Sequence, residues 1–192
     1  MWLIYFLGEI LIPRNTLVVL CGPAGSGKST WAAKHFIYTQ IVSSDECRAL
    51  VCDDASNQNV SKQAFDVMRF IIEKRLALGR LTVADATNLR REHRGEFIRI
   101  ASRFSFNTAA IVFDVPAEAC LERNAGRDRK VPRDALRNQL EMLEQTLRTV
   151  DSEAFSYVYV LDQNTLSSSR VRIGAFVSLQ SQRPVPESES RA

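Results

Sequence analysis

A glycine-rich stretch near the start of the chain carries the strongest chemical signal in the sequence. It reads GPAGSGKST and fits the pattern GxxxxGK[ST]. Glycines let the backbone bend so that successive N–H groups point inward at phosphate oxygens, and a helix beginning at the lysine adds its positive end. The pattern predicts a phosphate cradle, or P-loop, made of Gly22, Pro23, Ala24, Gly25, Ser26, Gly27, Lys28, Ser29 and Thr30.

Three side chains of this P-loop have separate expected roles. The Lys28 ammonium would contact the β- and γ-phosphates of ATP, and the Ser29 hydroxyl would ligate Mg²⁺. The Thr30 hydroxyl either touches the α-phosphate or only occupies the first helical turn. A glycine-rich turn with a chance lysine is the alternative, and the apolar strand before the motif and the helix after it argue against that. We therefore expect ATP and Mg²⁺ as cofactors.

Two charged residues, Asp45 and Arg48, follow the second expected strand in the sequence SSDECR. A carboxylate at that point projects over the carboxyl edge of a parallel sheet, where the P-loop also lies. Asp45 could accept a proton from an attacking hydroxyl. Arg48, one helical turn further on the same face, either holds an anionic group of the acceptor or supports Asp45. The structural alternative is an N-cap aspartate with a local i,i+3 ion pair.

A second polar group, in the sequence VADATN, ends the third expected strand. Asp85 would hold a water on Mg²⁺ or orient Arg48, and the strand before it is as apolar as a Walker B strand should be. Thr87 and Asn88 could hydrogen-bond phosphate or substrate. The structural alternative makes Asp85 a turn residue that caps the following helix.

Arginines crowd together in the sequence RNAGRDRKVPRDALR. Most charge runs are solvated helix surfaces, but the position of this one after a P-loop favours an anion-binding segment. Arg123 and Arg127, on a mobile lid, would close on the β- and γ-phosphates and neutralise the charge of the transferred group. The lesser candidates are Arg129, Lys130, Arg133 and Arg137.

The elements that must position these residues alternate along the chain. Short apolar runs predict strands at about 17–21, 41–43, 81–84, 108–113 and 157–161. Helical spacing and capping signals predict helices at about 28–36, 45–51, 61–79, 91–104, 116–124 and 133–150. The alternation predicts an α/β fold, with a five-stranded parallel sheet flanked by helices and an arginine-rich lid.

The two ends of the chain give weaker signals. The apolar start, MWLIYFLGEILIP, contains a glutamate and is too short to span a membrane, so it predicts a leading strand or a segment packed on the core. We expect a P-loop domain at 1–163 and a C-terminal extension at 164–192, whose last part is polar and disordered. The stretch SSSRVRIGAFVS within it is either one more strand or a surface arm.

The composition indicates which class of protein this is but does not identify a substrate. The chain has 192 residues and a formal net charge of +3, which suits one globular domain and does not by itself indicate nucleic-acid binding. Four cysteines without CxxC spacing and only two histidines make a zinc site unfavourable. Free thiols then predict a reducing, cytoplasmic location.

Four motifs in order carry a resemblance that covers most of the chain. They read GPAGSGKST, VSSDECRALVCDD, LALGRLTVADATNL and CLER with its following arginines. Residues 13–161 thereby resemble the kinase domain of bacterial polynucleotide kinase–phosphatases, whose core is similar to phage polynucleotide kinase. The P-loop part is generic, and the second and third motifs are more specific.

The resemblance implies phosphorylation of 5′-hydroxyl ends of RNA or DNA. By it, Lys28 and Ser29 match the P-loop lysine and serine, Asp45 the general base and Arg48 the acceptor-binding arginine. Arg123 and Arg127 match the lid arginines. Phosphatase and ligase domains, which family members often carry, have no room in this chain, so such activities would belong to other chains or absent domains.

Two alternatives remain open at the level of sequence. A small-molecule kinase, acting on a sugar acid, nucleoside, antibiotic or peptidoglycan precursor, would use the same scaffold. A non-catalytic ATP-binding module would regulate a partner through its lid, although such a module would not need the carboxylate of Asp45.

Overall fold

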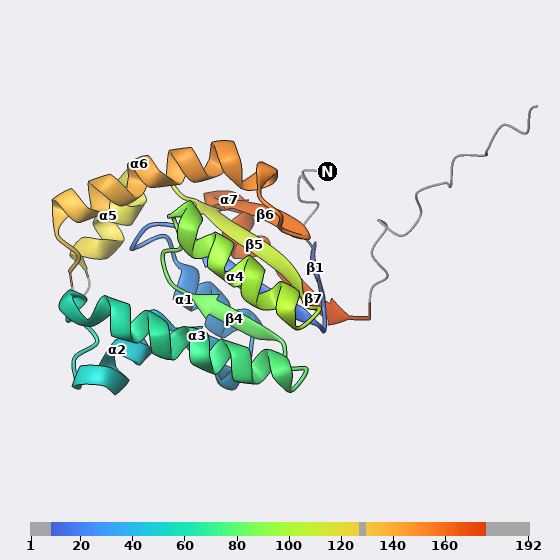
Figure 1. Cartoon of the computed structure of the whole chain (residues 1–192). Helices are drawn as coiled ribbons and strands as arrows, with labels where there is room; N and C mark the ends of the chain where they lie inside the picture. Colours follow the sequence, from blue (N-terminus) through green and yellow to red (C-terminus); the bar gives the residue numbers. More distant parts are fainter. Residues whose placement is uncertain (1–8, 127–129, 176–192) are drawn as a thin grey trace, which may run out of the picture.

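The main sheet has five parallel strands. The structure, a computed structural model, describes residues 9–126 and 130–175 (Figure 1). The strands are β2 (Thr16–Cys21), β3 (Ile41–Ser43), β4 (Thr82–Asp85), β5 (Asn107–Asp114) and β6 (Tyr157–Asp162). They pair in the order β3-β4-β2-β5-β6, with every pair parallel. This confirms the five-stranded parallel sheet that the alternation of elements predicts.

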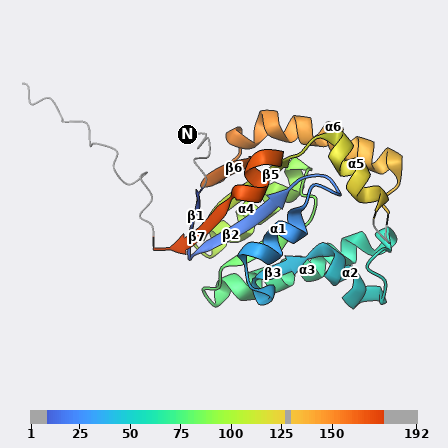
Figure 2. The same ribbon diagram turned by 180° about the vertical axis from the view of Figure 1, so that it is seen from behind.

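Helices cover both faces of this sheet. They are α1 (Lys28–His35), α2 (Ser44–Cys52), α3 (Ser61–Ala77), α4 (Arg91–Arg103), α5 (Ala117–Ala125) and α6 (Arg133–Thr149). Figure 1 shows α4 in front of the sheet, and Figure 2 shows α1 on the opposite face. Every residue of β2 is buried, because the central strand of a doubly wound sheet is covered on both sides.

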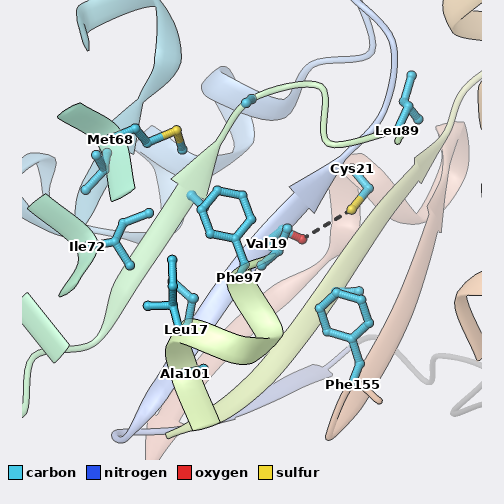
Figure 3. Packing of buried hydrophobic residues seen from close by; sticks show 14 of the residues in the cluster. Leu17, Val19, Cys21, Met68, Ile72, Leu89, Phe97, Ala101 and Phe155 are labelled. Carbon is cyan, nitrogen blue, oxygen red and sulfur yellow. Dashed lines mark hydrogen bonds between the residues drawn. The ribbon is translucent and has the colours of Figure 1, made fainter. Parts of the chain in front are cut away.

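Two apolar clusters form the core, one on each face. In the first, Leu17 and Val19 of β2 lie near Phe97 of α4 and near Met68 and Ile72 of α3 (Figure 3). In the second, Trp31 of α1 packs edge-on against Phe113 of β5, and Cys120 of α5 belongs to the same cluster. The sheet and its helices therefore form one packed body, which fixes the edge where the strands end.

A small second sheet joins the two ends of the described chain. Strand β1 (Glu9–Pro13) pairs in parallel with β7 (Arg170–Gly174), and the short helix α7 (Gln163–Ser168) leads into β7. The Tyr159 hydroxyl donates to the Leu11 carbonyl at 2.8 Å, and Trp31 Nε1 donates to Ser169 Oγ at 2.8 Å. The apolar start and the stretch after β6 thus both contain strands. The boundary at residue 163 stays a prediction.

Helix ends differ from the sequence expectation by single residues. Pro116 is the N-cap residue of α5, so this helix begins one residue later than the predicted start at 116. Pro132 is the N-cap residue of α6, which begins at Arg133 as predicted. Ser61 is the first residue of α3, where the sequence predicts a helix to begin, and Val60 is the N-cap residue. Gly79 follows α3 with a φ of 69°, as expected of a glycine that ends a helix. No helix within 9–126 and 130–175 is long and apolar enough to cross a bilayer.

Candidate nucleotide and acceptor site

The P-loop joins the buried end of β2 to the start of α1. Gly25 has a φ of 80° and Gly27 a φ of 93°, in the left-handed region that favours glycine. A Cβ atom on Gly25 would lie 2.4 Å from the Cys120 carbonyl oxygen of α5, so this position needs glycine for space as well as for conformation. The expected turn is therefore present, with its backbone bent and closely backed by α5.

The start of α1 is suited to bind an anion. No side chain caps its first turn, and no acidic residue occurs in that turn. The Lys28 ammonium folds over the loop, donating to the Pro23 carbonyl at 2.7 Å and to Ser26 Oγ at 3.4 Å. The loop thus combines backbone N–H groups, the positive end of a helix and one cation, which is the chemistry that polyphosphates require.

A cleft of about 830 Å³ opens over the P-loop. Ala24, Gly25, Gly27, Lys28 and Ser29 line it from the loop side. The other walls come from α2 and the start of α3 on one side and from the beginning of α6 on the other, and Figure 1 shows these helices gathered at the same end of the sheet. The expected P-loop residues do not all face this space.

Four P-loop residues lie outside the lining of the cleft. Gly22, Pro23 and Ser26 are buried in the loop, and a Cβ on Gly22 would come within 2.9 Å of Ser26 Oγ. Thr30 is exposed on α1. Of the two hydroxyls expected near the phosphates, only that of Ser29 belongs to a residue of the cleft wall.

Asp45 lies in the first turn of α2, at the carboxyl end of β3, and lines the cleft. The N-cap residue is Ser43, whose Oγ accepts from the Asp45 N–H at 3.2 Å, so Asp45 is not itself the cap. The side chain of Asp45 is 52% exposed, which leaves the carboxylate accessible to an incoming group.

Arg48 forms an ion pair with Asp45 and is itself only 6% exposed. Its Nε donates to the Ala55 carbonyl at 2.9 Å, which fixes the guanidinium against the loop after α2. The local i,i+3 ion pair of the structural alternative is therefore present. It coexists with a carboxylate that faces the cleft, and of the two expected roles for Arg48 the geometry favours support of Asp45.

Asp85 ends β4 and lies between the P-loop strand and the Asp45 strand. It is buried, lines the cleft, and is in register with Leu20 of β2 and Ser43 of β3. Thr87 also lines the cleft, and its carbonyl accepts from the Gly22 N–H at 2.9 Å. Both expected residues are therefore brought to the site.

Asn88 is not brought to the site, which corrects the expectation that it contacts substrate. Its side chain is fully buried, does not line the cleft, and donates from Nδ2 to the carbonyls of Leu20 at 2.8 Å and Ala84 at 3.3 Å. It adopts a φ of 45°, a conformation that asparagine tolerates better than most residues. Asn88 thus joins the ends of two strands instead of facing a ligand.

The arginine-rich segment contributes to the site in part. Arg123 Nη1 donates to the Gly25 carbonyl at 3.4 Å, so this arginine lies against the P-loop. Arg127 and Arg129 fall outside the described residues. Lys130 lines the cleft, whereas the exposed Arg133 and Arg137 do not. Of the two arginines that were expected to form the lid, Arg123 is therefore described in contact with the P-loop, and Arg127 is not described.

Several residues that the sequence analysis did not select also line the cleft. Gln139 of α6 accepts from the Ala24 N–H at 2.8 Å, across 115 positions of sequence. Phe65 of α3 lines the acceptor side and lies 5.2 Å from the ring of His93. Ser43, Ser44, Ser56, Gln58 and Ser61 line the same wall. Helical spacing placed Phe65 among core positions, and no spacing signal distinguished Gln139.

A buried ion pair lies behind the cleft, between the loop after β4 and α6. Arg94 of α4 binds Glu153 through two contacts, and both side chains are almost completely buried. The same guanidinium donates to the Asn88 carbonyl at 3.0 Å and to Thr146 Oγ1 of α6 at 3.2 Å. Arg94 therefore connects the loop after β4 with the helix that carries Gln139.

The cysteine nearest the P-loop does not take part in nucleophilic chemistry. Cys21 ends β2 and is completely buried, and burial raises the pKa of its thiol to about 12. A thiol with that pKa stays protonated at neutral pH and packs as an apolar side chain. All four cysteines are free.

Solved structures that share this fold come from differently named proteins. A structure of the Pnkp1/Rnl/Hen1 RNA repair complex matches with a TM-score of 0.61 and 22% identity, covering 71% of this chain and 46% of that one. The AvrRxo1-ORF1:-ORF2 complex with ATP matches with a TM-score of 0.55 and 15% identity, covering 72% and 50%. The chain thus spans about half the length of these two matched chains.

A third structure matches over nearly its whole length. The sugar kinase from Janibacter sp. HTCC2649 has a TM-score of 0.52 and 19% identity, with 81% of this chain and 91% of that chain covered. At these identities the likeness shows the fold alone, which is that of P-loop kinases. No curated protein matches the sequence of the chain.

The family comparison covers the segment that contains the cleft and its walls. Residues 17–148 match the family described as AAA domain (AAA_33), which is well over half of the chain. The match runs from the second residue of β2, through the P-loop, to the last turn of α6. This protein therefore belongs to the AAA domain family AAA_33.

Proposed function

We propose that the chain is an ATP-dependent polynucleotide kinase that transfers the γ-phosphate of ATP to 5′-hydroxyl ends of RNA or DNA. The observation that carries the proposal is the position of Asp45. Its half-exposed carboxylate faces the same cleft as the P-loop and is held there by Arg48. The motifs around Asp45 and Asp85 are also those that resemble polynucleotide kinases.

The P-loop half fits ATP and Mg²⁺ in the chemistry of its donors. Two glycines with positive φ, an uncapped helix start and the Lys28 ammonium would hold the phosphates. Ser29 would supply the hydroxyl ligand of Mg²⁺, and the Asp85 carboxylate would hold a water molecule that is bound to the same ion. Bound ATP would supply the phosphoryl group, and Mg²⁺ would offset part of the negative charge on its phosphates.

The acceptor half performs the proton transfer. The 5′-hydroxyl oxygen forms a bond to the γ-phosphorus while the bond from that phosphorus to the ADP oxygen breaks, and Asp45 takes the hydroxyl proton. Arg48 positions the Asp45 carboxylate through their ion pair. Arg123, beside the Gly25 carbonyl, and Arg127 would neutralise charge on the transferred group.

A small-metabolite kinase is the second candidate, and two observations favour it. The sugar kinase fold matches this chain over 91% of its own length, whereas the RNA repair chain is only 46% covered. The acceptor wall also carries neutral polar groups, Ser56, Gln58 and Ser61, of a kind that hydrogen-bond sugar hydroxyls as well as nucleosides.

An end-labelling assay separates the two candidates. The chain is incubated with radiolabelled γ-phosphate ATP and matched RNA and DNA oligonucleotides that carry a 5′-hydroxyl, with 5′-phosphorylated oligonucleotides as the matched control. We expect label on the 5′-hydroxyl ends only. Absence of label on both oligonucleotides, together with transfer to a sugar or another small metabolite, would reverse the ranking.

A further inference from the structure

Two helices, α5 and α6, each form a hydrogen bond with a residue of the P-loop, and the two P-loop residues are adjacent. Gln139 of α6 accepts from the Ala24 N–H at 2.8 Å, and Arg123 of α5 donates to the Gly25 carbonyl at 3.4 Å. The backbone of α5 is seated directly against the loop, because a Cβ on Gly25 would lie 2.4 Å from the Cys120 carbonyl. The bend of the P-loop is therefore held from outside the motif.

The position of Gln139 on α6 is unusual for a polar residue. Leu136 and Leu143 are buried on the inner face of this helix, and Gln139 lies between them at the i+3 position of the same face. Apolar residues normally occupy such positions. The half-buried amide oxygen accepts there from a backbone N–H of the P-loop, which an apolar side chain could not do.

Two hydrogen bonds join the end of α5 to Val131, which lies shortly before α6. The side chain of Asn124 donates from Nδ2 to the Val131 carbonyl at 2.9 Å, and its Oδ1 accepts from the Val131 N–H at 3.0 Å. This pair of hydrogen bonds keeps the end of α5 close to the approach to α6. The helices that carry Arg123 and Gln139 are thereby linked, and both side chains contact the P-loop.

We infer that Gln139 is a positioning residue that preorganises the P-loop for nucleotide. By accepting from the Ala24 N–H, it fixes the peptide between Pro23 and Ala24, so the N–H groups that follow converge before a nucleotide arrives. Preorganisation raises affinity because less conformational freedom is lost on binding. The inference rests on the nucleotide-binding part of the proposed function and is independent of the acceptor.

The test compares two glutamines of the same helix. Gln139→Met removes the acceptor oxygen at similar volume, and Gln145→Met makes the same change on the exposed surface of α6. Calorimetric titration of both variants with ATP and with ADP gives four dissociation constants to compare with the unaltered chain. We expect Gln139→Met to weaken ATP and ADP by the same factor, about tenfold, and Gln145→Met to change neither. Unchanged affinities in Gln139→Met, or a loss confined to ATP, would overturn the inference.

Hydrogen exchange gives a second measurement that needs no nucleotide. In Gln139→Met the Ala24 amide should exchange faster than in the unaltered chain, whereas Gln139→Glu, which keeps an acceptor oxygen, should retain its protection. Equal exchange at Ala24 in Gln139→Met and the unaltered chain would also overturn the inference. These measurements are independent of the end-labelling assay. If the unaltered chain failed to label 5′-ends while Gln139→Met bound ATP and ADP more weakly, the proposed acceptor would be wrong and the positioning role of Gln139 would still hold.

Discussion

The two halves of the cleft are built from different parts of the polypeptide. The nucleotide half is mainly backbone: left-handed glycines at 25 and 27, the uncapped start of α1 and the Lys28 ammonium. The acceptor half is made of side chains from α2, the following loop and α3, with Asp45 and Phe65 among them. Backbone geometry tolerates few substitutions, whereas side chains can be exchanged without altering the fold.

This difference explains why the two halves carry unequal information about function. The bend at Gly25 is enforced by conformation and by the Cys120 carbonyl 2.4 Å from the Cβ that any other residue would add. No comparable constraint governs Ser56, Gln58 or Ser61, which lie on the loop and at the start of α3. Substrate class can therefore vary on this fold while the nucleotide site stays the same.

Replacing Lys28 with alanine breaks the nucleotide half and should have the largest effect. The ammonium is lost from the loop, so both nucleotide affinity and stabilisation of the transferred group decline. We expect kcat/KM to fall about 10⁴-fold, combining a loss of about 10²–10³ in turnover with weaker ATP binding. Steady-state kinetics and ATP titration measure the two parts. Unchanged ATP affinity would show that the Lys28 ammonium does not bind the phosphates of ATP.

Replacing Asp45 with alanine breaks the acceptor half alone. Loss of a general base reduces turnover by about 10²–10⁴-fold, so we expect a fall of about 10³-fold in kcat. ATP affinity should stay within about twofold of the unaltered chain, since Asp45 does not belong to the P-loop. Single-turnover transfer and ATP titration provide the contrast with Lys28→Ala. An unchanged rate would show that another group takes the proton.

Replacing Arg94 with methionine removes a buried contact between the loop after β4 and α6. The change leaves Glu153 buried without its ion-pair partner, and breaking such a pair costs about 3 kcal/mol. We expect the free energy of unfolding, measured by urea denaturation, to fall by about that amount. Arg69→Met provides the control, because its ion pairs with Asp66 and Glu96 are partly exposed. Equal effects of the two changes would contradict this expectation.

Replacing Phe65 with alanine sharpens the question of what the acceptor half recognises. If a nucleobase stacks on this ring, the change should raise the KM for a 5′-hydroxyl oligonucleotide about tenfold, within the range for loss of one stacking contact. An acceptor without a terminal base should show no such increase. Phe70→Ala, an exposed phenylalanine on the same helix outside the cleft lining, is the matched control. Equal losses for both acceptors would exclude base stacking.

Features encoded within a short stretch of sequence were predictable. The buried run of β2, the glycines after it and the start of α1 follow one another, so a single pattern specified strand, turn and helix. The Ser43 strand end and Asp85 could be placed at one edge because parallel strands share their carboxyl ends, and their register confirms this neighbourhood.

Features that depend on distant contacts were not predictable. The use of Gln139 depends on where α6 lies over Ala24, which no local pattern specifies. Phe65 matched helical core spacing, and its position at the edge of the cluster, lining the cleft, follows only from how α3 packs. Asn88 was misassigned because an asparagine after a strand has the same appearance whether its amide meets a ligand or, as here, the carbonyls of two strands.

The pairing of β1 with β7 bears on how the chain is completed as it leaves the ribosome. The buried Ile10 and Ile12 are made well before the strand that pairs with theirs, which is almost the last part of the described chain. The Ser169 hydroxyl that meets the Trp31 indole, behind the helix that follows the P-loop, arrives equally late. Nascent chains cut before residue 169 would therefore leave β1 without its partner strand, and α1 gains the contact between Trp31 and Ser169 only after α7 has been made.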